Sequence, residues 1–458
     1  MLKRFPESGI SINKINETLN EYGKNDIKNS RGRLFTYFYD PGLKELDDLS
    51  SILLKFYNRN GMDYHAFPST LKIENDLIAM MVNLMHGNED SAGTFTTGGT
   101  ESILLAMKAA RDKFMEENNG IPEIVAPITA HPAFSKAAQY LGMKIIKVPV
   151  NDNYIATADN INEFINDRTA AVIGSAPSFP YGGIDDIKGI SDLACDKNLW
   201  LHVDACVGGM ILPFLKNLGV KINDFDFKLP GISSMSIDLH KYGFTPKGSS
   251  VVLYKNRELR KRQIYVNADW PGYPMSNAGM QATKSAGPLA ASWATINFLG
   301  LEGYTKLAEK TLKAYKKISD GIKKQGYNIV GKPDATIFAF SHDDKDIIDL
   351  GMKMIDNGWY PQIQPGNLSM NIPESIHLNM APVHLDVADE FLEFFGEIDK
   401  NVKPKDKNIY KIDSLNHALE TIKREKSMLF RIIRCNDPEI SEKIFLEMTD
   451  EDFTLTYS

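Results

Sequence analysis

The stretch Ser236-Ile237-Asp238-Leu239-His240-Lys241-Tyr242-Gly243 contains a lysine that follows a histidine, directly after a short strand-like run and before a glycine turn. A lysine at the end of a buried strand loses its charge readily, because desolvation favours the neutral amine. The neutral amine is the form that builds a Schiff base with an aldehyde. Most lysines are solvated surface groups, so the rest of the chain must show whether Lys241 has this role.

The bulk composition limits the class of protein. A chain of 458 residues is long enough for two or three domains. The net charge of -7 argues against a nucleic-acid-binding protein, which usually carries a basic face. Three cysteines without metal-binding spacing fit a reducing compartment, so we expect a cytoplasmic protein without zinc or dithiol chemistry. We expect no signal peptide and no transmembrane segment, because no apolar run of sufficient length occurs.

The pattern along the chain divides it into four segments. Residues 1–60 form a polar arm with one amphipathic helix, and residues 61–300 alternate apolar runs with helical stretches, which indicates a mostly parallel sheet covered on both faces. Residues 301–400 fit a smaller α+β domain that starts with a helix near Gly303, and residues 401–458 fit a linker with a helical tail over 413–426. We expect strands of the large domain at 123–128, 145–149, 170–174, 199–204, 233–237 and 249–254, and helices at 101–116, 132–141, 159–166 and 185–197.

The segment Thr96-Thr97-Gly98-Gly99-Thr100-Glu101-Ser102 precedes an amphipathic helix. Its two glycines allow a tight turn, and the free N–H groups at a helix start, together with the helix dipole, attract a phosphate group. Gly98, Gly99 and Thr100, called the phosphate turn below, are therefore candidate phosphate-binding residues. A plain helix start with a Thr or Ser cap is the alternative. The segment is neither a P-loop nor a dinucleotide-binding glycine motif.

Two more polar residues follow expected strands. His131 comes after the strand at 123–128, where its ring can stack on a planar heterocycle; a helix-start histidine with a satisfied hydrogen bond is the alternative. Asp204 ends the strand at 199–204, where a carboxylate is costly unless it is paired, for instance with a protonated ring nitrogen; an N-cap is the alternative. The order of phosphate turn, histidine, aspartate and Lys241 predicts a site for pyridoxal phosphate, since a charged pyridine ring stores electrons.

Five motifs in this order resemble those of a known family. They are TGGTES at 97–102, HPAF at 131–134, APSFP at 176–180, HVDA at 202–205 and HKYG at 240–243. The set resembles the group II decarboxylase family of fold-type-I pyridoxal phosphate enzymes, and residues 240–254 are most similar to sphingosine-1-phosphate lyases. The resemblance implies the α/β fold of PLP-dependent transferases (aspartate aminotransferase, fold type I), with a mostly parallel seven-stranded sheet in the large domain and a small C-terminal α+β domain.

The resemblance also implies how the cofactor is held. Lys241 would be the Schiff-base lysine, Asp204 would pair with the pyridine nitrogen, and His131 would stack on the ring. The phosphate turn would hold the cofactor phosphate together with Ser236 and His240. These roles make Lys241, Asp204 and His131 the candidate catalytic residues.

A homodimer with shared active sites is a further implication. Tyr39 matches a tyrosine that the partner subunit brings to the site, and Lys247 matches a lysine that helps to bind the substrate phosphate. Asn60 matches the first residue of an Asn-x-x-His element, and Thr283 matches a serine of a Ser-Arg pair. These four residues are the candidate substrate residues.

The chain departs from the lyase pattern at several positions, and the first is Phe35-Thr36-Tyr37, which stand where the lyases usually show Ser-Gly-Ala. Asp63 occupies the place of the histidine in Asn-x-x-His, Phe179 stands where the lyases often carry tyrosine, and Lys284 replaces the arginine of the Ser-Arg pair. Lysine keeps the charge but lacks the two-pronged hydrogen bonding that suits phosphate. The cofactor site is thus intact, while the substrate-phosphate site is altered.

We expect a lyase that acts on a small amino substrate, with Lys241 or His131 moving protons. Retro-aldol cleavage of a phosphorylated amino alcohol, which gives an aldehyde and an amine, is the first hypothesis. Decarboxylation of an L-amino acid is the second, and a catalytically silent cofactor-binding paralogue is the third. Retro-aldol cleavage needs a base near a substrate hydroxyl, whereas decarboxylation needs a site that destabilises a carboxylate, and the sequence places neither group.

Overall fold

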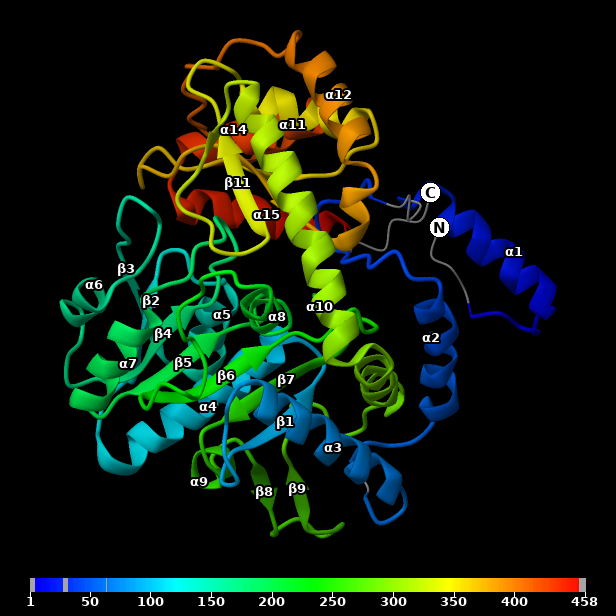
Figure 1. Ribbon diagram of the computed structural model, residues 1–458, viewed down its shortest axis with the longest axis vertical. Coiled ribbons are helices and arrows are strands. Elements are labelled where there is room, and N and C mark those ends of the chain that lie inside the picture. Colours follow the sequence, from blue (N-terminus) through cyan, green and yellow to red (C-terminus); the bar gives the residue numbers. More distant parts are fainter. Residues whose placement is uncertain (1–4, 28–31, 63, 453–458) are drawn as a thin grey trace.

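A seven-stranded sheet forms the centre of the large domain in the computed structural model, which describes residues 5–27, 32–62 and 64–452 (Figure 1). The strand order is β1-β7-β6-β5-β4-β2-β3; β7 runs antiparallel to β1 and β6, and the other neighbours are parallel. The strands are β1 Ala92–Thr96, β2 Glu123–Pro127, β3 Lys144–Val148, β4 Thr169–Ser175, β5 Trp200–Asp204, β6 Ile232–Ile237 and β7 Ser250–Tyr254. This arrangement confirms the expected mostly parallel seven-stranded sheet.

Alternate residues of each strand point to opposite faces of the sheet, and helices cover both faces. Val125 and Val172 belong to one core, while their neighbours Ile124 and Ile173 belong to the other. The first core includes helices α3 Pro68–Leu84, α6 Ala158–Asn162, α7 Ile187–Asp196, α8 Leu212–Asn217 and α10 Gly287–Lys324; the second includes α4 Gly99–Glu117 and α5 Ala133–Leu141, with α9 Arg257–Lys261 packed against it. Because β2, β4, β5 and β6 are parallel, their carboxyl ends meet at one edge.

Several elements of the large domain differ from the sequence-based expectation. Helices α3, α8 and α9 and the antiparallel pair β8 Tyr265–Asn267 and β9 Met275–Asn277 were not expected, and three further differences have a physical reason. β1 was not expected, because its first residues, Ala92 and Gly93, rarely form strands. Its extended conformation is stabilised by pairing with β7, which compensates for the low strand preference of these residues. α10 starts at Gly287 instead of Gly303; Gly300, with φ of 56°, interrupts its helical geometry and the apolar pattern. α6 ends at Asn162, because the chain then tightens through a bond from the Phe164 N–H to the Ile161 carbonyl.

The small domain contains a four-stranded antiparallel sheet, in the order β10-β11-β13-β12. Its elements are β10 Asn328–Ile329, β11 Ile337–Ser341, α11 Ile347–Asp356, β12 Gln362–Gln364, β13 Ser375–Asn379, η2 Pro382–Leu385 and α12 Ala388–Asp399. The hydroxyl of Tyr242, next to Lys241, donates to the Met380 carbonyl at 2.7 Å and accepts from the Thr336 hydroxyl at 2.8 Å. The small domain is therefore tied directly to the turn that carries Lys241.

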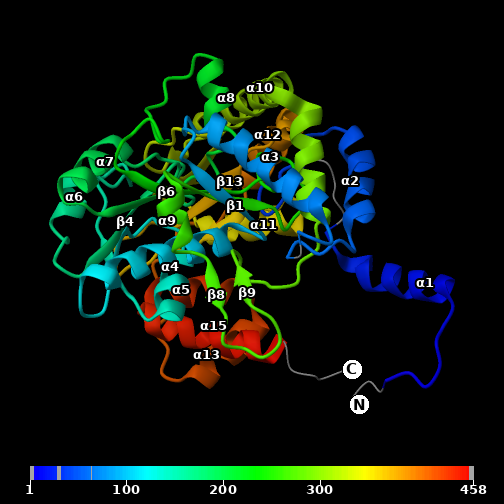
Figure 2. The same cartoon turned by 90° about the horizontal axis from the view of Figure 1, so that it is seen from below.

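The two ends of the chain add helices outside these domains. Helix α1 Ile12–Tyr22 projects away from the body in both views and has no buried residue, η1 Gly23–Asn25 follows it, and α2 Glu45–Phe56 packs on α10 (Figures 1 and 2). The last helices are α13 Leu415–Arg424, α14 Ser427–Cys435 and α15 Pro438–Asp452. Only α13 was expected; α14 buries Arg431 and Arg434, which do not count as apolar positions in a sequence pattern. No helix of the described residues has the length and apolar character of a membrane span.

Candidate active site

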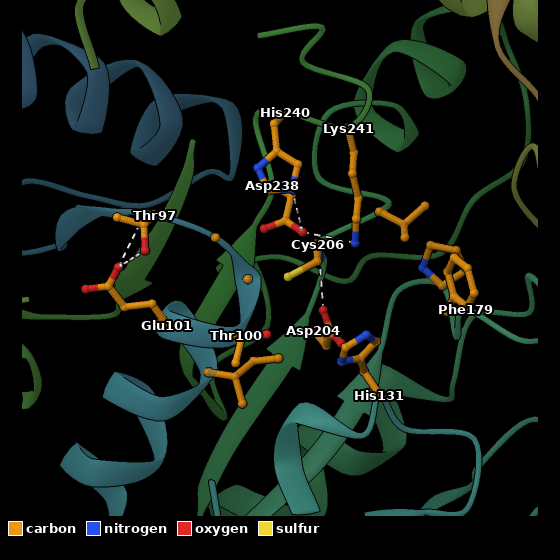
Figure 3. Close-up of a pocket in the computed structure, with 15 residues that line it drawn as sticks. Thr97, Thr100, Glu101, His131, Phe179, Asp204, Cys206, Asp238, His240 and Lys241 are labelled. Atoms are coloured by element: carbon orange, nitrogen blue, oxygen red, sulfur yellow. Dashed lines mark hydrogen bonds and ion pairs between the residues drawn. The ribbon is translucent and has the colours of Figure 1, made fainter. Parts of the chain in front are cut away.

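A cavity of about 400 Å³ opens where β2, β5 and β6 end, and Figure 3 shows the side chains around it. Seven of the residues predicted from sequence line it: Gly98, Gly99, Thr100, His131, Asp204, His240 and Lys241. Five others do not belong to its lining: Ser236, Tyr39, Asn60, Lys247 and Thr283. All candidate cofactor residues except Ser236 thus line the cavity, whereas none of the four candidate substrate residues does, although Tyr39 and Lys247 lie beside the turn that carries Lys241.

The phosphate turn leads into α4, whose first residue is Gly99 and whose N-cap is Gly98. A side chain on Gly99 would come within 2.8 Å of both Asp238 Oδ1 and Cys206 Sγ, so only glycine allows this close approach. The Glu101 carboxylate accepts from the N–H and the hydroxyl of Thr97, at 2.7 and 2.6 Å, and closes the turn. The open N–H groups at the start of α4 therefore border the cavity and favour an anion there.

Asp204 ends β5 and is only 8% exposed. Its Oδ1 accepts from the Cys206 N–H at 3.0 Å and from the Ser236 hydroxyl at 3.4 Å. Ser236 lies directly across from Asp204 on β6 and is fully buried. The Ser236 hydroxyl also lies 3.2 Å from both His202 Nε2 and Cys206 Sγ, and Ser236 does not line the cavity, so this position does not support the role implied for it as a phosphate ligand.

His131 lies between β2 and α5, at the edge of the cavity (Figure 3). Its Nδ1 accepts from the Ala133 N–H at 3.2 Å, which leaves the ring proton on Nε2. Burial lowers the pKa of the His131 ring, and the opposing influence of Asp204 does not reverse this. A neutral imidazole at neutral pH suits stacking on a planar heterocycle.

Lys241 does not behave as the sequence predicted. Its Nζ lies 2.9 Å from Asp238 Oδ2, and the His240 Nε2 lies 3.8 Å from the same oxygen (Figure 3). Burial is the largest single influence and would lower the pKa of the Lys241 amine, but Asp238, supported by Cys206, Tyr39 and Asp204, raises it above its ordinary value. In the chain alone Lys241 is therefore a paired cation, because the surrounding acidic groups together outweigh desolvation.

Asp238 is expected to control the reactivity of Lys241. Replacing Asp238 by asparagine removes the charge that raises the pKa of Lys241, so the fraction of neutral amine at pH 7–8 should increase about tenfold or more. The measurement is the rate at which acetic anhydride modifies Lys241 in cofactor-free protein, followed by peptide mass spectrometry across a pH series. Asp204→Asn is the control, because Asp204 makes no direct contact with Lys241 and is the last and smallest of the named contributions to its pKa. Equal rates in wild type and Asp238→Asn would contradict this role.

The same pair makes the cofactor-free fold sensitive to pH. The pKa of Asp238 lies below its ordinary value, because Lys241 and His240 outweigh burial. Its contribution to stability is therefore present above the ordinary carboxyl pKa and is lost as the pH falls through the lowered value. The contribution of Lys241, whose pKa is raised, is lost as the pH rises through the raised value.

Tyr39 and Lys247 lie beside the turn that carries Lys241. The Tyr39 ring packs edge-on against Tyr242 with centroids 4.7 Å apart, and Lys247 Nζ lies 5.9 Å from the Tyr39 ring. Burial raises the pKa of the Tyr39 hydroxyl to about 12, so it stays protonated. The expectation that the partner subunit supplies this tyrosine needs correction, since Tyr39 reaches the turn of its own chain through a buried aromatic contact.

Asn60 and Thr283 belong to a second group of residues. Asn60 forms a β-bridge with Ser285, and the Gly61 N–H donates to the Lys284 carbonyl at 2.8 Å. Lys284 lines a separate cavity of about 200 Å³, where its Nζ donates to the Phe95 carbonyl at 3.2 Å. The two segments predicted to bind substrate are thus neighbours, but away from Lys241. Asp63, the remaining departure in this region, lies outside the described residues.

Sequence reasoning missed several residues that line the main cavity. Asp238, Cys206, Thr97, Glu101, Pro177, Ile103 and Val207 were not singled out as site residues. For Asp238 a signal existed, because an aspartate three residues before a lysine in a turn can fold back on it. Cys206 follows Asp204 by two residues, and its thiol lies 3.2 Å from the Ser236 hydroxyl. Burial raises the pKa of the Cys206 thiol, so it remains protonated.

Comparison with known proteins gives a consistent set of similarities. Residues 3–342 match the family described as pyridoxal-dependent decarboxylase conserved domain. The chain is 38% identical to the sphingosine-1-phosphate lyase of Drosophila melanogaster over 398 residues, which cover 85% of this chain and 71% of that protein. It is 30% identical to the L-aspartate/L-glutamate decarboxylase of Pyrococcus horikoshii over 400 residues, which cover 86% of this chain and 99% of that protein.

Among solved structures, the sphingosine-1-phosphate lyase of Burkholderia pseudomallei is similar with a TM-score of 0.83 and 32% identity. The match covers 88% of this chain and 93% of that chain. The chain spans 71% of the length of the fruit fly lyase, 63% of the rice lyase and 72% of the rat lyase.

Proposed function

The chain belongs to the pyridoxal-dependent decarboxylase family, and from this we propose that it is a carbon–carbon lyase that cleaves a phosphorylated amino alcohol such as sphingosine 1-phosphate. The observation that carries the proposal is the cavity in which the phosphate turn, His131, Asp204 and Lys241 meet. Similarity to sphingosine-1-phosphate lyases over 85% of the chain supports this choice of reaction.

The residues around the cavity fit pyridoxal phosphate. A side chain on Gly98 would project into open space, where the nearest atom is His240 Cε1 at 3.9 Å, so this glycine leaves room beside the N–H groups of α4. The cavity lining also includes a buried carboxylate, Asp204, and an amine, Lys241. The cofactor phosphate requires an anion-binding site, its ring nitrogen requires a carboxylate, and its aldehyde requires a lysine, and the cavity contains all three.

Each residue then has a defined task. Pyridoxal phosphate, when bound, supplies the aldehyde that takes up the substrate amine and the ring that stores the electrons of the broken bond. Asp204, oriented by Ser236 and the Cys206 N–H, keeps a proton on the ring nitrogen. His131 would cover the ring as a neutral imidazole. Lys241 anchors the cofactor and, once released, is an amine close enough to move a proton.

Retro-aldol cleavage also needs a base for the substrate hydroxyl and a contact for its phosphate. Tyr39 and Lys247 flank the lysine turn; the Tyr39 hydroxyl stays protonated and is therefore a hydrogen-bond donor rather than the base, and Lys247 offers a cation. Lys247 is exposed and its Nζ donates to the His240 carbonyl at 3.4 Å, so it can turn toward a substrate phosphate without leaving a buried partner unpaired. These two residues are the proposed substrate contacts of the same subunit.

Decarboxylation of an acidic amino acid is the second candidate. The observation that favours it is the match to the Pyrococcus decarboxylase over 99% of that protein. Asn60 and Thr283 also lie outside the cavity of their own chain, so a single chain supplies neither of these expected substrate contacts.

The decisive experiment compares the products from two kinds of substrate. The holoenzyme is incubated separately with sphingosine 1-phosphate and with L-aspartate or L-glutamate. We expect release of a long-chain aldehyde and phosphoethanolamine from the first and no carbon dioxide from the others. Carbon dioxide without aldehyde would replace the lyase by the decarboxylase, and neither product would leave a silent cofactor-binding protein.

We also propose that the protein works as a homodimer in which Asn60 and Thr283 of one subunit complete the site of the other. Two observations support this. Both residues belong to one surface region away from their own cavity. Large apolar side chains are exposed close to that region in sequence, among them Leu54, Tyr57 and Met280.

Subunit mixing tests the shared site. Lys241→Ala and Asn60→Ala proteins are unfolded or dissociated together, reassembled and assayed. If sites are shared, the mixed dimer has one intact site, and the mixture should recover up to about a quarter of wild-type activity. A monomer in light scattering, or no recovery from mixed dimers, would contradict the proposal.

A cytoplasmic location is proposed from the cysteines. Cys195, Cys206 and Cys435 are all unpaired, which suits a reducing compartment. Cell fractionation with an antibody against the protein tests it, and recovery in an oxidising compartment would contradict it.

A further inference from the structure

One wall of the cavity is held by residues of the small domain. Phe179 lines the cavity, and its ring packs on the ring of His377 with centroids 4.3 Å apart. The carbonyl of the next residue, Pro180, accepts from His377 Nδ1 at 3.1 Å and from Gln364 Nε2 at 3.3 Å. We propose that His377 and Gln364 are positioning residues for this wall. We propose further that helix α14, which belongs to residues 401–458 (called the C-terminal unit below), holds the strands that carry these two residues.

The two positioning residues lie on neighbouring strands whose contacts orient them. Gln364 on β12 pairs with Ser375 on β13, and the Ser375 hydroxyl donates to Gln364 Oε1 at 2.7 Å. This bond leaves the amide nitrogen of Gln364 facing Pro180. His377 is fully buried, and its Nε2 lies 3.0 Å from Asn379 Oδ1. Both side chains are therefore held in one orientation by the hairpin of β12 and β13, not by the large domain that they contact.

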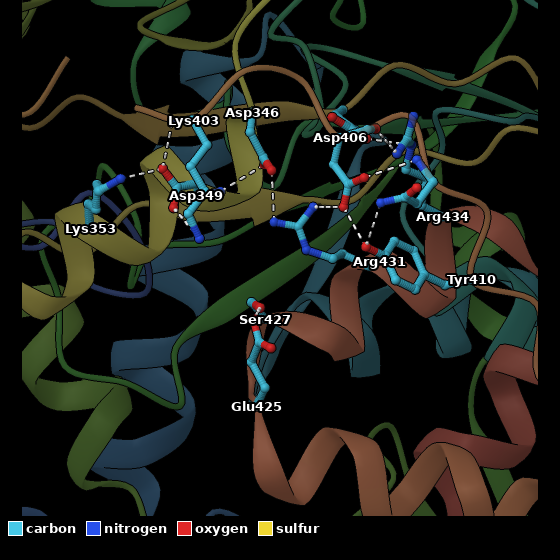
Figure 4. A network of polar contacts seen from close by, with 12 residues as sticks. Asp346, Asp349, Lys353, Lys403, Asp406, Tyr410, Glu425, Ser427, Arg431 and Arg434 are labelled. Carbon is cyan, nitrogen blue, oxygen red and sulfur yellow. Dashed lines mark hydrogen bonds and ion pairs between the residues drawn. The ribbon is translucent and has the colours of Figure 1, made fainter. Parts of the chain in front are cut away.

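The C-terminal unit also contacts the hairpin of β12 and β13. Glu374, which directly precedes Ser375, pairs with the guanidinium of Arg434 on α14, and the two side chains are 7% and 10% exposed. The Arg434 carbonyl accepts from the Leu368 N–H at 3.0 Å, and its Nη1 donates to the Asp406 carbonyl at 2.8 Å (Figure 4). A charge pair this deep is screened little by salt, and removing one partner leaves a buried charge alone. A contact path thus runs from α14 through the hairpin to the cavity wall.

The wall itself is a short turn with few bonds of its own. The Ser178 N–H donates to the Gly183 carbonyl at 2.8 Å, and the Gly182 N–H donates to the Ser178 carbonyl at 2.9 Å. A side chain on Gly182 would come within 2.0 Å of the Ile337 carbonyl, so the turn is pressed against β11 of the small domain. A shift of the hairpin therefore moves Phe179, whose ring bounds the space for substrate.

The test uses the intact holoenzyme and the variant Arg434→Gln. The amides of Ser178, Phe179 and residues 181–183 should exchange with deuterium about tenfold faster than in wild type, because their support loosens. The KM for the substrate should rise about tenfold while the absorbance of bound cofactor stays the same, since the wall is displaced but the cofactor contacts are not. The second effect rests on the proposed function, whereas hydrogen exchange does not, so failure of the one is distinguishable from failure of the other.

Arg431→Gln is the matched control. Arg431 lies one turn earlier on α14 and is 9% exposed, but it pairs with Asp346 and Asp406 instead of the hairpin (Figure 4). Its variant should leave the amide exchange of Ser178, Phe179 and residues 181–183 unchanged. Ser375→Ala, which removes only the hydroxyl that orients Gln364, should reproduce the effect of Arg434→Gln if that variant folds poorly. Wild-type exchange in both test variants, or equal acceleration in Arg431→Gln, would overturn the proposal.

Discussion

Replacing Lys241 by alanine is expected to lower kcat/KM by a factor of about 10³ or more. Lys241 is the lysine of the cavity, and alanine can neither anchor the cofactor nor move a proton. The fold should survive, because alanine removes the cation of a pair whose other member, Asp238, can take up a proton. The measurement is steady-state kinetics on sphingosine 1-phosphate, with the visible absorbance of the cofactor recorded on the same samples.

Lys188→Ala is the control for this substitution. Lys188 forms an exposed ion pair with Asp192 on α7, and such pairs contribute little to stability. This variant should match wild type in rate and absorbance. More than a tenth of wild-type activity in Lys241→Ala would show that another residue performs the chemistry.

Replacing Asp204 by asparagine is expected to lower kcat by a factor of about 10² to 10⁴. Asparagine has the same size and its amide oxygen can still accept from the Cys206 N–H, so the local structure is retained. It lacks the charge that keeps a proton on the ring nitrogen. The loss should therefore fall on kcat more than on KM, and the midpoint of thermal unfolding should change little.

Asp226→Asn supplies the matched comparison for Asp204→Asn. Asp226 is 2% exposed and lies 2.9 Å from His86 Nδ1, so it is also a buried aspartate with a basic partner, but it does not line the cavity. Its variant should alter stability without altering kcat. Similar kcat values for Asp204→Asn and wild type would mean that the ring nitrogen has another partner.

The parts of the site that sequence reasoning found are those set by local order along the chain. Asp204 and the phosphate turn each follow a strand or open a helix, and parallel strands bring such positions to one edge of the sheet. The six expected strands of the large domain lie within one or two residues of those observed for the same reason, since their apolar runs are continuous. Strand β1 could not be recognised from the sequence alone, because its conformation depends on pairing with β7.

The features that sequence reasoning missed are contacts between particular side chains. Spacing alone did not tell that Asp238 would fold back on Lys241 and keep it charged, which reverses the expected effect of burial. It also did not tell that Ser236 faces Asp204. The strand register fixes the second contact, and the compact turn after β6 fixes the first; neither is encoded in residue types alone.

The C-terminal unit shows a different limit. Its helix α14 is nine residues long and turns Arg431 and Arg434 inward, so the buried face carries charges and escapes an apolar pattern. The role of these arginines became visible only with their partners, Asp346 and Glu374, which precede them by 85 and 60 residues in sequence.

The central claim is that Lys241 carries pyridoxal phosphate, and chemical trapping tests it most directly. The purified protein is saturated with pyridoxal phosphate, reduced with borohydride and digested, and the labelled peptide is identified by mass spectrometry. We expect a single phosphopyridoxyl group on Lys241 and none in Lys241→Ala. A label on another lysine, or no label in wild type, would contradict the account.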